Sequence, residues 1–400
     1  MKKSLIFAAV AAVVLSACAK IETVKVASVD EAVTFGVYAG NAATKATYGD
    51  ITTDNLKTSA DGFGVFAYYT EENEWADASA STKPNFMYNQ QVKHDDAANT
   101  TLYPSKWVYT PIKYWPNGQN NTTVEAQTIN DKLSFFAYAP QIATSNAGVP
   151  ETAVPADGQG ITAVSANDVT GAPTVTFTVP AAADKQIDLL WATPMLNQTK
   201  QSVTGTVNFV FKHALAKLNV KVQAVVDAVA PTTSNLPAAT KIILESLELK
   251  AGGTKTGTLS LADGTWSSKS GETDVTYNTE AFASTTTVND KTGFNVTETA
   301  TDLNSAISPM IVPGEVATGE YVIIANYWVI TEDAALDGGY STVQQIIKKT
   351  NTSAITFEQS KKYDVLVKLG LTNVSFDVTV ENWGDPAGSN SVDLPANTAS

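Results

Sequence analysis

The chain of 400 residues contains no arginine, one cysteine and two histidines, and only 16% of its residues are charged. All 26 basic residues are lysines, so the planar guanidinium group that usually recognises phosphate or carboxylate is absent. A single cysteine excludes a disulfide within the chain and a thiolate metal cluster. The net charge of −14 argues against nucleic acid or an anionic lipid surface as a partner.

Sequence signatures of catalysis are also missing. The chain has no Gly-x-Ser-x-Gly, no His-Glu-x-x-His, no phosphate-binding glycine loop and no calcium loop. We therefore predict no enzyme activity, no catalytic residue, no cofactor and no metal site. His94 and His213 have no acid spaced as a fixed partner, and His213 is interpreted as a hydrogen-bonded structural residue. The acidic pairs at 71–72 and 95–96 are interpreted as solvated surface, with a weak calcium site left open.

The first 18 residues indicate export. Two lysines precede an apolar run from Leu5 to Val14, which is too short for a membrane span and is typical of a secretory signal. Residues 15–18 (LSAC) resemble the bacterial lipobox, so we predict a signal peptide over residues 1–17 and acylation of Cys18, for example with palmitate. Each buried methylene contributes roughly 0.8 kcal/mol, so two or more chains anchor a protein almost permanently. The alternative is an ordinary signal peptide beside a stray thiol.

The rest of the chain has the composition of a long β-protein. Thr, Ser, Asn, Val and Ala are abundant, and short alternating runs are separated by Gly, Pro and Asn turns. This predicts an all-β fold with two tandem antiparallel β-sandwich domains and few short helices. We expect a tether and removable strand at 18–45, an N-terminal sandwich at 46–200 and a C-terminal sandwich at 201–400. Residues 71–104 suggest a surface excursion, and the spacing within 341–349 predicts a helix.

One strand near the N-terminus is of particular interest. Val33, Phe35 and Val37 alternate with a period of two, which predicts one buried strand face. Small polar residues follow it, and they contain the basic residue Lys45, after which a protease could cut before Ala46. Removal of the strand would leave an apolar groove flanked by unpaired backbone groups, which is an acceptor for a strand from another molecule. The alternative is that the strand stays in place and Lys45 is an ordinary surface lysine.

A second pattern concerns the middle of the chain. Apolar residues alternate on odd positions over 207–213 and on even positions from 218 onward, so we expect a kink or break near residues 213–217.

Several segments together resemble the fimbrillins of the Bacteroidia, a family of shaft proteins and shorter Mfa-like proteins. In order, they are the lipobox at Cys18, TKAT at 44–47, YWP at 114–116 before LSFFAYAP at 133–140, IDLL at 187–190 before FKHALAKL at 211–218, and the strand 363–371 with VTVENW at 378–383. Each segment alone is weak, but their order is specific and covers nearly the whole chain after the signal peptide.

The resemblance implies transthyretin-like sandwich domains, an outer-membrane lipoprotein and assembly into a type V pilus. In that family a trypsin-like protease removes the N-terminal strand after a basic residue, usually arginine, and a neighbour's C-terminal segment fills the groove. Here the cut would fall between Lys45 and Ala46, and the donor strand would contain Val392 and Leu394. Lysine in place of arginine departs from the pattern, because an arginine-specific protease could not process this chain.

We therefore predict a structural subunit of a surface fimbrium that supports adhesion by donor-strand exchange. Its implied partners are other pilin subunits in a homo- or hetero-polymer, the outer membrane through the lipid at Cys18, and a processing protease. The alternative is an uncleaved outer-membrane lipoprotein that acts as a pilus anchor, as a tip adhesin, or as a module binding host or bacterial glycans or proteins.

Overall fold

The computed structural model describes residues 32–39, 51–116, 131–152, 160–181, 186–200, 202–225, 239–304 and 308–383. Within these ranges the chain is almost entirely β-structure, and its longest helix, α1, has 6 residues. The all-β prediction is confirmed. None of the described helices is long and apolar enough to cross a lipid bilayer.

The described residues of the first half of the chain form ten strands and three short helices. In order they are β1 (Thr34–Tyr38), α1 (Thr53–Thr58), β2 (Phe63–Tyr69), α2 (Trp75–Ala78), the 3-10 helix η1 (Ser79–Ser81), β3 (Met87–His94), β4 (Trp107–Val108), β5 (Leu133–Ala139), β6 (Gly160–Val164), β7 (Thr174–Thr178), β8 (Leu190–Ala192), β9 (Met195–Gln198) and β10 (Thr206–His213). The excursion predicted at 71–104 therefore contains α2, η1 and the strand β3.

The second half contains the longer strands. In order they are β11 (Ala216–Ala224), β12 (Thr240–Ser260), β13 (Trp266–Tyr277), β14 (Thr286–Val288), β15 (Lys291–Val296), β16 (Thr301–Asp302), β17 (Met310–Ile311), β18 (Gly314–Val316), β19 (Tyr321–Glu332), β20 (Tyr340–Thr350), β21 (Ile355–Phe357), β22 (Lys361–Leu369) and β23 (Val374–Asn382).

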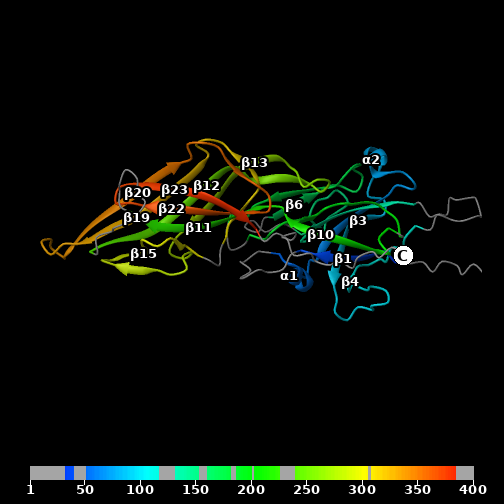
Figure 1. Ribbon diagram of the computed structural model, residues 1–400, viewed down its shortest axis with the longest axis horizontal. Coiled ribbons are helices and arrows are strands. Elements are labelled where there is room, and N and C mark those ends of the chain that lie inside the picture. The colour runs from blue at the N-terminus through cyan, green and yellow to red at the C-terminus, as the bar shows by residue number, and fades with distance from the viewer. Residues whose placement is uncertain are drawn as a thin grey trace, which may run out of the picture.

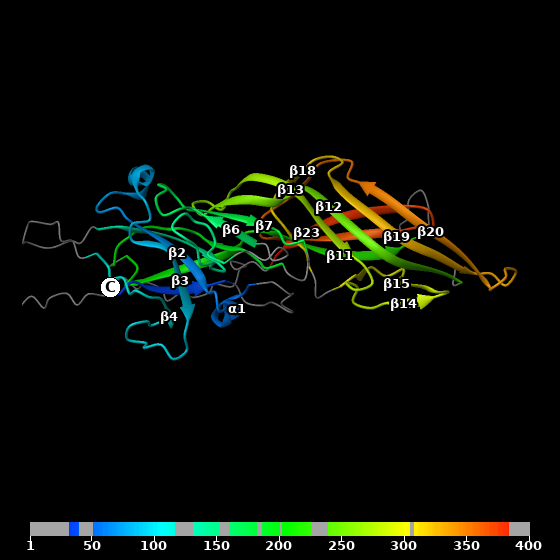
Figure 2. The same cartoon turned by 180° about the vertical axis from the view of Figure 1, so that it is seen from behind.

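The strands form an elongated molecule with two sheet-rich halves (Figure 1). The first half is built on one sheet of order β1-β10-β8-β5-β2-β3-β4, in which β9 also pairs with β5. In the second half, a sheet of order β16-β11-β22-β23 packs against one of order β14-β15-β12-β19-β20. The view from behind shows β6 and β7 reaching from the first half to the long strands of the second (Figure 2), and β7 pairs with β12 there.

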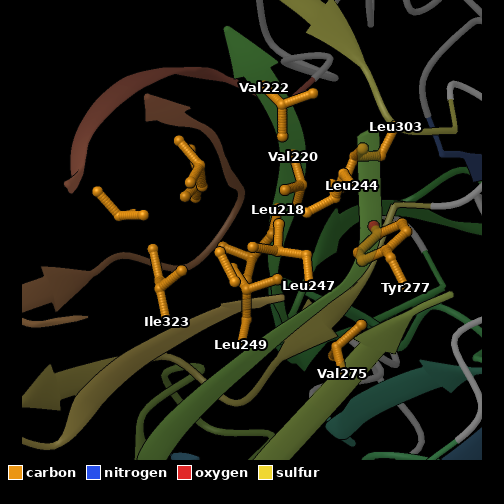
Figure 3. Close-up of a cluster of buried hydrophobic side chains, with 14 of the residues drawn as sticks. Leu218, Val220, Val222, Leu244, Leu247, Leu249, Val275, Tyr277, Leu303 and Ile323 are labelled. Atoms are coloured by element: carbon orange, nitrogen blue, oxygen red, sulfur yellow. The ribbon is translucent and has the colours of Figure 1, made fainter. Parts of the chain in front are cut away.

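Three clusters of buried side chains hold these layers together. One lies within the first half, and a second fills the space between the two sheets of the second half, where β11 supplies Leu218, Val220 and Val222 (Figure 3). The third cluster joins the halves, because it combines β2 and β5 of the first with residues of β12 and with Trp383. The sandwich-like packing thus extends across the junction.

Two strand pairs are parallel, which differs from the purely antiparallel sandwiches that the sequence predicted. β1 runs parallel to β10, and β11 runs parallel to β22. The paired residues Thr34 and Thr206 are 172 positions apart, and Asn219 and Asp364 are 145 apart. A local pattern of strands and turns predicts hairpin neighbours, which are antiparallel. The direction of such distant pairs depends instead on how the layers pack.

The helix predicted at 341–349 is wrong, because this segment lies in β20 and pairs with β19 along its whole length. Ile347 packs on the core, whereas Val343 and Ile346 are 48% and 68% exposed. In a strand Val343 and Ile347 share one face and Ile346 lies on the other, so the helical spacing of the three residues does not match the strand period. The β-branched side chains and the neighbouring long strand β19 favour the extended form.

The break predicted near residues 213–217 is confirmed, since β10 ends at His213 and β11 begins at Ala216. β10 follows the boundary that we expected at residue 200, yet it pairs with β1 and β8 in the sheet of the first half. We therefore propose that the boundary between the two sandwiches lies at residues 214–215, between β10 and β11.

Gly264 offers a test of the packing between the halves. It turns the hairpin between β12 and β13 with φ +74°, and an added Cβ would lie 2.1 Å from the buried ring of Trp191. Gly253 has a similar φ of +69° but no atom near an added Cβ. Both Gly→Ala changes should lower the free energy of unfolding by about 1–2 kcal/mol, because alanine is strained at a positive φ. Gly264→Ala should lower it by about 1–3 kcal/mol more, because the added methyl group displaces the Trp191 ring. Equal urea midpoints for the two variants would contradict this.

Candidate functional site

β1 is the strand that the sequence singled out, and it lies at one edge of the sheet of the first half. Val33 and Phe35 are completely buried, and Val37 is half-buried and packs against the same core. Between them Thr34 and Gly36 are also buried. The structure thus places the three predicted residues on one face of one strand, pointing into the core.

Phe35 lies in a cluster of aromatic rings. Its ring centroid lies 5.7 Å from that of Phe209, with which it stacks, and 5.5 Å from that of Tyr109. The rings of Phe63 and Phe135 complete this aromatic cluster in T-shaped contacts, with their centroids 6.2 and 6.1 Å from that of Phe35. Complete burial of such a side chain contributes roughly 1.5–3 kcal/mol, and each well-oriented aromatic pair adds about 0.5–1.5 kcal/mol. Phe35 is therefore the main apolar anchor of β1.

The backbone of β1 is paired along one edge, and the residue just before β1 is bonded on the other side. On one side it pairs in parallel with β10, from Thr34 opposite Thr206 to Tyr38 opposite Val210. On the other side the Val33 amide donates to the Lys113 carbonyl at 2.9 Å. β1 thus fills a slot between β10 and the segment that follows β4.

Polar side chains fix the position of β1 in this slot. The Tyr109 hydroxyl donates to the Val33 carbonyl at 2.8 Å and accepts from the Lys113 amide at 3.3 Å. The Thr34 hydroxyl lies 2.7 Å from that of Thr206. Burial raises the pKa of Tyr109 well above its ordinary value, so its hydroxyl keeps its proton at physiological pH.

Gly36 marks the closest approach between β1 and β10. A Cβ at this position would lie 2.0 Å from the Asn208 side-chain oxygen. Asn208 is exposed, so its amide can swing away toward solvent. Any strand that occupies this slot needs either a small residue opposite Asn208 or that rotation.

The sequence did not identify Tyr109 and Lys113 as partners of β1. In this stretch the structure has the two-residue strand β4, after which the chain crosses to β1. Nothing in the local pattern indicated that a hydroxyl would meet a backbone carbonyl 76 residues away.

The other predicted site residues fall elsewhere. Cys18, Lys45, Ala46, Val392 and Leu394 lie outside the described residues. Among the residues that are described, no group of three or more His, Cys, Asp and Glu side chains is arranged to hold a metal ion.

Of the two histidines, His213 has a fixed acidic partner that sequence spacing did not reveal. Its Nδ1 lies 2.6 Å from the buried Oδ2 of Asp188, and its ring stacks on Trp383 with centroids 4.1 Å apart and planes at 5°. These contacts agree with the prediction of a hydrogen-bonded structural residue. The ring of His94 packs edge-on against Trp107, with centroids 5.1 Å apart.

Truncation of Phe35 should show how far the first half depends on β1. Phe35→Ala removes a completely buried ring and should lower the free energy of unfolding by about 3–5 kcal/mol, measured as a drop in the thermal midpoint. The matched change Tyr38→Ala removes a half-buried ring from the same strand. A cost for Phe35→Ala no larger than that of Tyr38→Ala would contradict the anchoring role.

Comparisons with known proteins agree with this architecture. The chain is 29% identical over 367 residues to the fimbrium subunit Fim1C of Phocaeicola vulgatus, covering 85% of this chain and 86% of that protein. Its fold is similar to the crystal structure of a fimbrial protein from Bacteroides vulgatus, with a TM-score of 0.67, 24% identity, and coverage of 88% of this chain and 100% of that one. The model of the fimbrillin-like family matches residues 44–383, and this chain therefore belongs to that family.

Proposed function

We propose that this protein is a structural subunit of a cell-surface fimbrium that supports adhesion. In this proposal it is exported as a lipoprotein and held in the outer membrane through Cys18. A protease cuts between Lys45 and Ala46 and frees β1, and a strand from a neighbouring subunit takes its place. The observation that carries the proposal is the position of β1, a strand whose central ring, Phe35, is completely buried and whose pairing partner lies 172 residues away.

The contacts of β1 explain why its loss would drive assembly. Without β1, the rings of Phe63, Phe135 and Phe209 lose their packing against Phe35, and the edge of β10 is unpaired. Exposed sheet edges with an adjoining apolar surface readily accept a strand from another chain. A cut subunit is thus incomplete alone and becomes complete within a polymer.

The candidate donor is the C-terminal segment with Val392 and Leu394. These two side chains alternate as the inward-facing residues of β1 do, so they could occupy two of the three positions that Val33, Phe35 and Val37 fill. Pro395 follows directly and cannot donate a backbone hydrogen bond, which limits the donor strand on that side.

A second candidate function is an uncleaved surface lipoprotein that serves as a pilus anchor or tip adhesin, or that binds glycans. Two observations favour it. The basic residue at the cleavage position is lysine, and β1 is paired with β10 over its whole length and bonded to Lys113 through Val33, which stabilises the closed form. In this case β1 would remain in place for the life of the protein.

Limited lysine-specific proteolysis of the unacylated chain, residues 19–400, tests the two functions against each other. A pilin should be cut after Lys45 and then form a ladder of multimers that resists detergent on an unheated gel, with the cleavage site identified by mass spectrometry. Lys45→Ala should block both events. Leu394→Asp should permit the cut but reduce the ladder. A chain that resists cleavage there and stays monomeric would overturn the polymerising function.

Removal of the Tyr109 hydroxyl should loosen β1 without disturbing the aromatic cluster around Phe35. Tyr109→Phe leaves the Val33 carbonyl without its donor, which costs about 1 kcal/mol and should speed hydrogen exchange in residues 32–39 roughly fivefold. Tyr103→Phe is the matched control, because that hydroxyl donates to the Tyr109 carbonyl and does not touch β1. Equal exchange of β1 in the two variants would exclude the clamping role of Tyr109.

A further inference from the structure

The second half carries a long sheet edge at β20. This strand pairs with β19 from Tyr340 to Thr350 and is the last strand of its sheet, so within the described residues one of its edges is paired and the other is not. The most exposed large apolar side chain in the described residues, Ile346 at 68%, lies on it together with Val343 at 48%. Soluble proteins usually keep such edges short or cover them.

We propose that this edge is an interface through which two copies of the protein pair side by side, β20 against β20, in antiparallel orientation. A two-fold axis that passes through Gln345 uses the whole strand and sets Tyr340 opposite Thr350. In this register Val343 faces Ile347 of the second copy, and the two Ile346 side chains are diagonal neighbours. Cross-strand apolar pairs of this kind are the usual stabilising unit of a sheet.

The charges on β20 and its hairpin fit a second copy of the same chain. The loop between β19 and β20 begins after Glu332 and carries Asp333 and Asp337, whereas Lys348 and Lys349 lie at the other end of β20. None of these five side chains forms an ion pair within the described part of the chain. Antiparallel pairing brings the acidic loop of each copy beside the lysines of the other. The lysines themselves lie opposite Ser341 and Thr342 rather than opposite one another.

This complementarity matters because the chain as a whole is acidic. With a net charge of −14, two copies repel each other unless they meet where the charges alternate in sign. The paired ends of β20 provide such a place twice, once on each side of the two-fold axis.

A groove at the end of β20 gives the hairpin loop a place to dock. It has a volume of about 460 Å³ and is lined by Lys349 and by apolar side chains that include Ile355, Phe376 and Val378. In the proposed register the loop that precedes Tyr340 projects past Thr350 of the second copy, toward this groove. Leu336, 44% exposed in that loop, is the apolar side chain that the groove suits.

The proposal goes beyond end-to-end assembly and does not depend on it, because β20 is far in the fold from β1 and is equally available when β1 is in place (Figure 1). In a surface fimbrium, such pairing would join neighbouring subunits or filaments laterally.

Sedimentation of the unacylated chain carrying Lys45→Ala tests the pairing without strand exchange. At low salt the mass should rise from one copy to two between micromolar and millimolar concentration. Ile346→Lys should weaken the dimer by roughly tenfold or more, because it removes apolar contact at the interface and adds like charges. Val380→Lys changes an equally exposed residue on β23, the edge of the other sheet, and should leave the dimer intact. A monomer at all concentrations would overturn the proposal.

A charge swap provides a sharper test. Lys348→Glu/Lys349→Glu should reduce self-pairing, and so should Asp333→Lys/Asp337→Lys, because each double change places like charges together at both ends of the interface. A mixture of these two variants should form a heterodimer again, since every loop then meets an opposite charge. If the lysines merely protect the edge from association, Lys348→Gln/Lys349→Gln should instead pair more strongly than the native chain, and that result would exclude the proposed register.

Discussion

The first half of this protein depends on the packing of one ring, that of Phe35, among four other aromatic rings. The strand that carries it is five residues long, and it contacts β10, which lies at the far end of the same half in sequence. A core strand in most sandwiches is tied to its neighbours by a hairpin. Here the apolar contacts, the ladder to β10 and the Tyr109 hydroxyl hold β1, so its place in the core is specified by its own side chains.

The local pattern of the sequence was sufficient to predict β1 and much of the fold class. Alternation at Val33, Phe35 and Val37 predicted a half-buried strand, and the phase slip near His213 predicted the end of β10, because both features depend only on neighbouring residues. The same reasoning failed at β20, where Val343, Ile346 and Ile347 have helical spacing although the segment is a strand. Pairing with β19 along the whole segment overrides that local pattern.

Contacts between distant segments could not be predicted in this way. His213 contacts Asp188 because β8 and β10 are neighbours in the sheet. The Tyr109 hydroxyl contacts the Val33 carbonyl because the chain crosses β1 after β4. In neither pair does the separation along the chain indicate that the two residues meet. The parallel direction of β1 relative to β10 could not be predicted from local patterns either, since it follows from the packing of layers and not from any turn.

The molecule thus offers two sheet edges of different character. The slot of β1 is aromatic and paired with β10 along its length, which suits a single long-lived occupant. The edge at β20 carries opposite charges at its two ends, which suits a reversible contact that weakens as salt screens it.

Trp383, the last described residue, stacks on His213, the last residue of β10. Tension applied at the C-terminal end of β23 passes along the backbone into that strand, which is paired with β22 over its whole length. A strand pulled along its own axis is loaded in shear, so the hydrogen bonds of its ladder must yield together and not one after another. The stack of Trp383 on His213 ties this end of β23 to the end of β10, so the loaded ladder and the strand that carries β1 meet at the junction between the halves.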